Sequence, residues 1–136
     1  MNQSFKATCM HAEDMGDYLL VGLADQKYDT VDHLMFQRTH EFDEQDIRLG
    51  MDAVHVQRND QGYSGYGGIR SVRLFPDRLH VEFDDEGIGF MGGLASTEVT
   101  FDFPGEVIER LRSALEECFA GFDCFRDETG NASREA

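Results

Sequence analysis

Residues 41–68 read EFDEQDIRLGMDAVHVQRNDQGYSGYGG and combine three different patterns. The stretch opens with an acidic cluster formed by Glu41, Asp43, Glu44, Asp46 and Asp52. It ends with a segment of Gly and Tyr at 62–68. Between them, residues 52–58 alternate in side-chain polarity, which is typical of a half-buried β-strand.

The strand at 52–58 is the first of three strands that the pattern predicts. Residues 59–62 are a turn signal, because Asn and Asp bond to the local backbone and Gly takes positive φ. Residues 63–75 return as a strand, Pro76 and Asp77 form the next turn, and 79–83 alternates in polarity again. We therefore predict a three-stranded antiparallel meander from 52 to 84.

Further strands are predicted on both sides of the meander. Residues 3–12 read as a first strand and 32–38 as another. Residues 17–24 are apolar on both faces, which predicts a central strand covered on both sides or lying deep in the core. The acidic segment has few apolar anchors, so we expect a turn or a single helical turn there. The Gly-rich residues 88–94 predict a bulged strand or a tight crossing of backbones, and 97–103 predicts a half-buried strand.

A helix is predicted at 104–119. Pro104 suits the first helical position, and Gly121 is a stop signal. Val107, Leu111, Ala114, Leu115 and Cys118 recur at helical spacing, so one stripe of the helix should lie on a sheet. The core is expected to include Val72, Leu74, Leu79, Val81, Phe83, Val99, Phe101, Leu111 and Leu115.

The length of 136 residues suits one domain. We predict a single α+β domain at 1–122, with an antiparallel meander and the C-terminal helix packed on one face of the sheet. The polar residues 123–136 are expected to form a flexible tail.

The charge is strongly negative, with 12 Lys and Arg against 27 Asp and Glu and a net charge of -15. This charge opposes binding to nucleic acid or to anionic membranes, and it favours a basic partner. It also explains solubility without any partner. Three cysteines at unrelated spacings are not a disulfide framework. No signal peptide or long apolar run is visible, so a cytoplasmic location is expected.

No catalytic or metal-binding motif stands out in the sequence. The carboxylates at 41–52 lack a partner nucleophile and the spacing of a calcium loop. The Gly segment at 62–68 matches neither a dinucleotide-binding nor a P-loop pattern. The histidines are scattered, with no HExxH or CxxC pattern. We expect no catalytic residue, no metal site and no cofactor.

Two motifs carry a resemblance to a known family. Residues 42–52 read FDEQDIRLGMD, and residues 66–69 read YGGI. Followed by alternating strands, a GFMGG segment, an FDF strand and a closing helix, they resemble the Imm10 family of immunity proteins, over roughly 18–119. The resemblance implies a protein that binds and neutralises a cognate toxin domain, and implies no enzymatic activity. A nuclease-like toxin with a basic surface would suit the charge.

Glu41, Asp43, Glu44 and Asp46 are the expected partner-binding residues, with Tyr63 and Tyr66 nearby as aromatic anchors. A structural alternative stays open, in which Asp43 or Asp52 caps local backbone N–H groups and Tyr66 belongs to the core. Two other functions also stay open. One is a small hydrolase or transferase that uses the 41–52 carboxylates, and the other is a homo-oligomeric structural protein. The sequence does not determine the oligomeric state.

Overall fold

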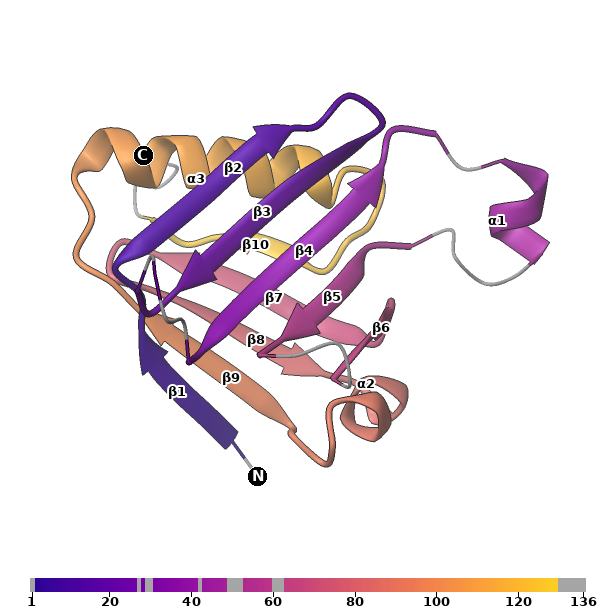
Figure 1. Cartoon of the computed structure of the whole chain (residues 1–136), viewed down its shortest axis with the longest axis horizontal. Helices are drawn as coiled ribbons and strands as arrows, with labels where there is room; N and C mark the ends of the chain where they lie inside the picture. The colour runs from indigo at the N-terminus through magenta and orange to yellow at the C-terminus, as the bar shows by residue number, and fades with distance from the viewer. Residues whose placement is uncertain are drawn as a thin grey trace.

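A computed structural model describes residues 2–26, 28, 31–41, 43–48, 53–59 and 63–129, without the side chain of Asp46. These residues form two five-stranded sheets (Figure 1). Sheet I has the order β1-β9-β8-β7-β10, with β1 Asn2–Lys6, β9 Ser96–Thr100, β8 Arg78–Phe83, β7 Ile69–Phe75 and β10 Phe125–Asp127. Sheet II has the order β2-β3-β4-β5-β6, with β2 Cys9–Asp14, β3 Tyr18–Ala24, β4 His33–Thr39, β5 His55–Arg58 and β6 Ser64–Tyr66. The described helices are α1 Glu44–Arg48, α2 Asp85–Phe90 and α3 Gly105–Cys118.

Sheet II is antiparallel throughout, and sheet I is mixed. In sheet I, β7, β8 and β9 are antiparallel to one another, while β1 runs parallel to β9 and β10 runs parallel to β7. Each sheet buries the alternate residues of its strands against the other layer. In β3, for example, Leu19, Val21 and Leu23 are buried and the residues between them are not.

The core lies between the two sheets and is completed by α3. Leu111, Leu115 and Cys118 of this helix are fully buried, and α3 contacts β2, β3 and β4 as well as β10. Arg38 of β4 fixes the end of the helix, because its guanidinium donates hydrogen bonds to the last carbonyl groups, including that of Cys118 at 3.1 Å. The α+β class and the C-terminal helix on one sheet face are confirmed, and all nine predicted core residues are buried.

The predicted meander is wrong in one respect, because it is divided between the two sheets. β5 and β6 pair in sheet II, whereas β7 and β8 pair in sheet I. The chain leaves sheet II at Gly67 and Gly68, whose φ angles are 70° and 73°. Two consecutive residues in this left-handed region turn the chain sharply, which only glycine does without strain.

The predicted strand at 3–12 is also divided. Its first half is β1 of sheet I and its second half is β2 of sheet II. The buried Ala7 donates a backbone hydrogen bond to Thr100 of sheet I, and Thr8 donates one to Ala24 of sheet II. A period-two pattern continues smoothly across such a crossing, so the pattern alone does not reveal it.

Residues 85–90 are helical, so a bulged strand beginning at 88 is wrong. The side chain of Asp84 caps α2 by accepting a hydrogen bond from the backbone N–H of Gly87 at 2.9 Å. A close approach of backbones lies just before the segment for which it was predicted, because a Cβ atom on Gly87 would overlap the carbonyl oxygen of Gly68. That oxygen accepts a hydrogen bond from the backbone N–H of Asp84.

Two further differences lie near the C-terminus. Pro104 is the N-cap of α3 and not its first helical residue. The segment 123–136 begins with a strand, because β10 pairs with β7 and the carbonyl of Leu74 accepts a hydrogen bond from Glu128. Phe125 stacks on Phe119 beyond α3, which explains why this part of the expected flexible tail is ordered. Residues 130–136 lie outside the described part of the chain.

The two glycines of α2 give a matched test of the contact between α2 and Gly68, where the chain passes from sheet II to sheet I. Gly87→Ala should destabilise the protein by about 2–3 kcal/mol, because the new methyl group overlaps backbone that cannot move away. Gly89→Ala should stabilise it by about 0.5–1 kcal/mol, since no atom of the described residues lies within 4 Å of the new Cβ and alanine favours the helix. Urea unfolding measures the change in the free energy of unfolding for each variant. Equal changes for Gly87→Ala and Gly89→Ala would contradict the contact.

Candidate functional site

The acidic segment forms a projection at one end of sheet II. It connects β4 to β5, and its helix α1 stands away from the two sheets (Figure 1). Glu41, Asp43 and Glu44 are exposed, as is Ile47, whose side chain is 57% accessible. Asp52 and the side chain of Asp46 lie outside the described residues. The expected single helical turn is therefore present, and it carries carboxylates into solvent.

The body of the protein holds the projection at both ends. On one side, His40 donates its backbone N–H to Asp17, and its Nε2 lies 2.9 Å from a carboxylate oxygen of Asp14. That contact and the backbone N–H of Gly16 lower the pKa of Asp14. On the other side, the carbonyl of Val54 accepts a hydrogen bond from Gly67 at 2.9 Å. The acidic segment thus leaves the sheet from fixed points.

Tyr66 lies at the base of this projection. Its ring meets the His55 ring edge-on, with centroids 4.9 Å apart, because the two residues are paired across β5 and β6. Together with Tyr18, Gln37, Arg38, Thr39 and Ala53, they line a hollow of about 140 Å³. Tyr66 is therefore a partly exposed surface residue beside the acidic segment.

Tyr63 lies on the opposite side of sheet II. It is paired with Arg58, whose guanidinium carbon lies 4.2 Å from the centre of the tyrosine ring. Arg58 also donates a hydrogen bond to the carbonyl of Met91, and the ring of Tyr63 packs on Gly92. The expectation that both tyrosines share one patch is wrong, because they are three positions apart, and side chains an odd number of positions apart along a strand face opposite sides.

The face of sheet II that points away from the core is a larger surface beside the acidic segment, and we call it the outer face. In Figure 1 it faces the viewer, and no described segment crosses in front of it. Its residues alternate with the buried ones along each strand. They are Cys9, His11 and Glu13 of β2; Tyr18, Leu20, Gly22 and Ala24 of β3; His33, Met35, Gln37 and Thr39 of β4; His55 and Gln57 of β5; and Ser64 and Tyr66 of β6.

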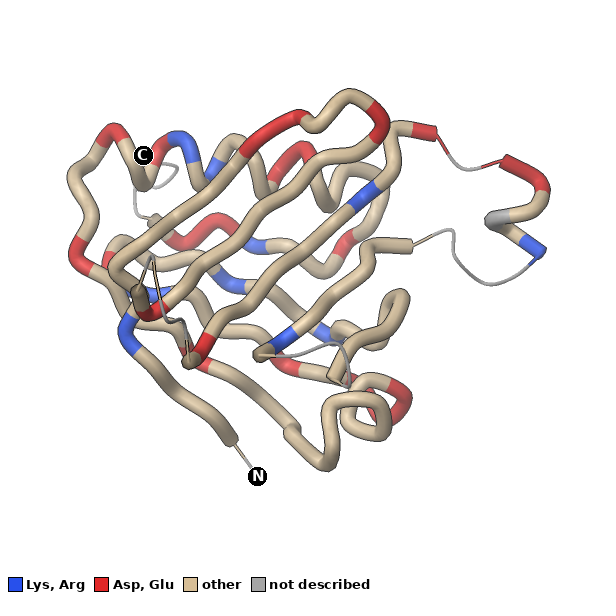
Figure 2. The backbone as a smooth tube through the Cα atoms, in the orientation of Figure 1, with Lys and Arg blue, Asp and Glu red and all other residues tan. Residues whose placement is uncertain are grey.

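The outer face carries almost no formal charge. Among its residues on β3 to β6 there is no Asp, Glu, Lys or Arg, and Glu13 on β2 is the one carboxylate. Figure 2 shows red at the margins of this sheet, while the blue positions on β4 and β5 are Arg38 and Arg58, which point inward. Acidic residues therefore border an uncharged centre.

Sheet I has a different solvent face, with charged residues in ion pairs. Arg78 lies 3.6 Å from Glu98, and Arg73 lies 2.9 Å from Glu128. The two faces belong to one chain with 29% charged residues. The uncharged outer face of sheet II is thus a local property and does not follow from the composition.

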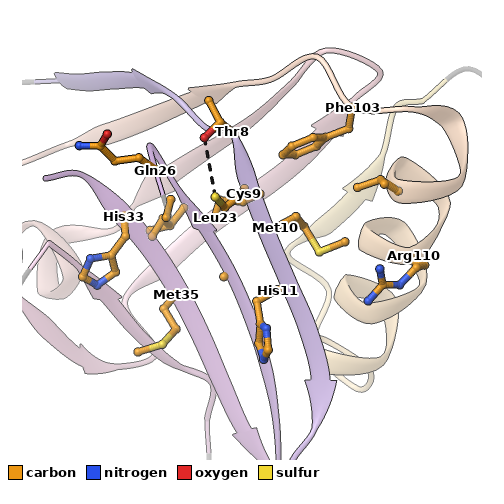
Figure 3. Close-up of a pocket in the computed structure, with 14 residues that line it drawn as sticks. Thr8, Cys9, Met10, His11, Leu23, Gln26, His33, Met35, Phe103 and Arg110 are labelled. Atoms are coloured by element: carbon orange, nitrogen blue, oxygen red, sulfur yellow. Dashed lines mark hydrogen bonds between the residues drawn. The ribbon is translucent and has the colours of Figure 1, made fainter. Parts of the chain in front are cut away.

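A second hollow, of about 730 Å³, opens at the other end of the outer face. Gly22 and Ala24 of β3 form its floor, because their side chains are small. Gly22 is paired with His11 and Met35 on the neighbouring strands, and Ala24 is paired with Cys9 and His33. Figure 3 shows Cys9, His11, His33 and Met35 on neighbouring strands, and Met10 extending toward Arg110 of α3. Phe103, Val107 and Arg110 line the hollow beyond the edge strand β2.

The part of the chain that the structure describes holds no group of three or more His, Cys, Asp or Glu that could bind a metal ion. Its helices are also too short or too polar to cross a bilayer.

The outer face was missed from the sequence, although a signal for it exists. Residues 17–24 are apolar on both sides, which led to the prediction of a strand covered on both sides.

His55 gives a test of the hollow beside α1. Burial lowers the pKa of His55 below its ordinary value of 6.5, and its buried Nδ1 has no hydrogen-bond partner among the described residues. Because the folded pKa is the lower of the two, the unfolded chain binds more of this proton than the folded chain as the pH falls through 6.5, so acid removes stability. The free energy of unfolding of the wild type minus that of His55→Gln should therefore decrease between pH 7.5 and pH 5.5. A constant difference would mean that His55 is fully hydrated.

Comparison with protein families matches residues 5–109 to Immunity protein 10, Imm10. The match covers the acidic segment, both sheets apart from β10 and the first three residues of β1, and the beginning of α3. Searches of curated proteins and of solved structures find no match. Since the matched residues make up more than half of the chain, the protein belongs to the Imm10 family of immunity proteins.

Proposed function

We propose that this protein binds a cognate toxin domain and neutralises it by direct contact, without catalysis of its own. The observation that carries the proposal is the family match over residues 5–109. The producing cell would need this protection in its own cytoplasm, where the toxin could otherwise act.

The charge supports a toxin with a basic surface, as a nuclease-like toxin would have. The net charge of -15 creates a negative field, which attracts a basic partner and raises the association rate. Glu41, Asp43 and Glu44 lie on the projection that α1 forms, so they are placed to meet such a partner before the sheets do. We assign Asp46 to the same acidic segment on its sequence position.

The outer end of the projection also offers an apolar contact. Ile47 is exposed on α1 beside the carboxylates. Charged residues that steer a partner together with an apolar residue that loses contact with water are a common combination in protein interfaces. Tyr66 at the base of the projection adds an aromatic side chain next to the acidic segment.

The proposal predicts a charge effect on the rate of association. Glu41→Lys combined with Glu44→Lys should lower the association rate with the toxin domain encoded beside this gene by about tenfold at low salt. The effect should shrink as salt is added, because ions screen exposed charges. Both residues are exposed, so the melting temperature should change little. Surface plasmon resonance at several salt concentrations measures the rates.

The matched control is Glu82→Lys combined with Glu128→Lys. These exposed residues lie on the solvent face of sheet I, on β8 and after β10, and the change in net charge is the same. The control should have a smaller effect at every salt concentration. A wild-type chain that neither binds the toxin domain nor protects cells that express it would overturn the proposed function.

A further inference from the structure

We propose that the uncharged outer face of sheet II is the surface that the toxin covers, with the acidic margin serving to bring the toxin there. This inference rests on the proposed function and specifies its contact surface. It predicts the chemistry of the toxin surface, which should present uncharged or aromatic side chains at its centre and basic residues around them.

The first argument is that β3 has the composition of a strand covered on both sides. Its buried side holds Leu19, Val21 and Leu23, and its outer side holds Tyr18, Leu20, Gly22 and Ala24. A strand at the centre of a sheet with one solvated face ordinarily alternates apolar with polar residues. No described segment of this chain covers the outer side, which leaves it open to a partner.

The second argument is that the uncharged side chains form a continuous row across the sheet. The register places Leu20 beside Gln37, Gln37 beside His55, and His55 beside Tyr66. Interface centres are depleted of charged residues and enriched in aromatic residues and Met. The row and the neighbouring Met35 fit this composition, whereas the ion-paired face of sheet I does not.

The third argument is the position of the carboxylates around this row. Glu13, Asp14 and Asp17 lie at the ends of β2 and β3, and Glu41 and Glu44 lie on the projection. Figure 2 shows these red segments at the margin of the sheet. Rim charges remain hydrated in a complex and act on the association rate, while an uncharged centre loses its water at little cost.

The two hollows are depressions in the outer face that side chains of a partner can fill. One lies between Tyr18 and Tyr66 beside the projection, and the other lies over Gly22 and Ala24. Side chains inserted into such hollows are the ones that dominate binding energy in protein interfaces. We therefore place the strongest contacts at the two ends of the face.

Substitutions of opposite charge at Gln37 test the inference. Gln37 is half-buried in the middle of the row, so either a Lys or a Glu would be buried without a partner in the complex. Gln37→Lys and Gln37→Glu should each accelerate dissociation of the neighbouring toxin domain by at least about thirtyfold. If only the overall negative field mattered, Gln37→Glu would bind as well as the wild type or better.

His80→Lys and His80→Glu are the matched controls. His80 is half-buried in the middle of sheet I, between β7 and β9, and faces the other solvent side. These variants should bind at the wild-type rate, and urea unfolding confirms that all four variants fold. Leu20→Ala adds a truncation without charge, which should weaken affinity at least about tenfold.

The outcomes separate this inference from the proposed function. A toxin that binds the Gln37 variants like the wild type would overturn the inference and leave the proposed function intact. A toxin that does not bind the wild type would overturn both. Sedimentation of the chain alone tests a second copy as the occupant: a dimer that Gln37→Lys dissociates would overturn the toxin as the partner that covers this face.

Discussion

The close contact between Gly68 and Gly87 is the constraint on which the arrangement of the two sheets depends. Gly68 accepts a hydrogen bond from Asp84 while the backbone of α2 lies against it, and neither glycine has room for a Cβ atom. The ring of Phe90 fills the space beside them and also packs on Gly65. The Gly/Tyr segment is therefore the site where the chain passes from one sheet to the other.

This crossing also determines which surfaces are left for a partner. Because β6 ends at the crossing, β5 and β6 complete sheet II and leave its outer face open. The acidic segment leaves the same end of the sheet, between the fixed points at His40 and Val54. An uncharged face and an acidic projection are thus held side by side by backbone contacts. A binding surface that is ordered in advance loses less conformational entropy when it binds.

Sequence patterns predicted the elements well and their assignment to sheets poorly. The periodicity of Leu79, Val81 and Phe83 identified β8, and the stripe of Leu111 and Leu115 identified α3, because burial on one side leaves a direct trace in the sequence. The crossings at Ala7 and at Gly67 leave none, since a strand pattern continues unchanged from one sheet into the next. The same limit applied to the candidate site. The acidic residues were visible in the sequence, but the separation of Tyr63 from Tyr66 and the absence of charge across β3 to β6 depend on register.

The central claim is that the toxin covers the outer face of sheet II. Oxidative footprinting of side chains in the free chain and in the complex with the neighbouring toxin domain tests it directly. Tyr18, Met35 and Tyr66 report on the outer face, and Phe75 reports on the solvent face of sheet I. If the toxin covers the outer face, it should strongly slow oxidation of the first three residues and leave oxidation of Phe75 unchanged. Slower oxidation of Phe75, with Tyr18, Met35 and Tyr66 unaffected, would contradict it.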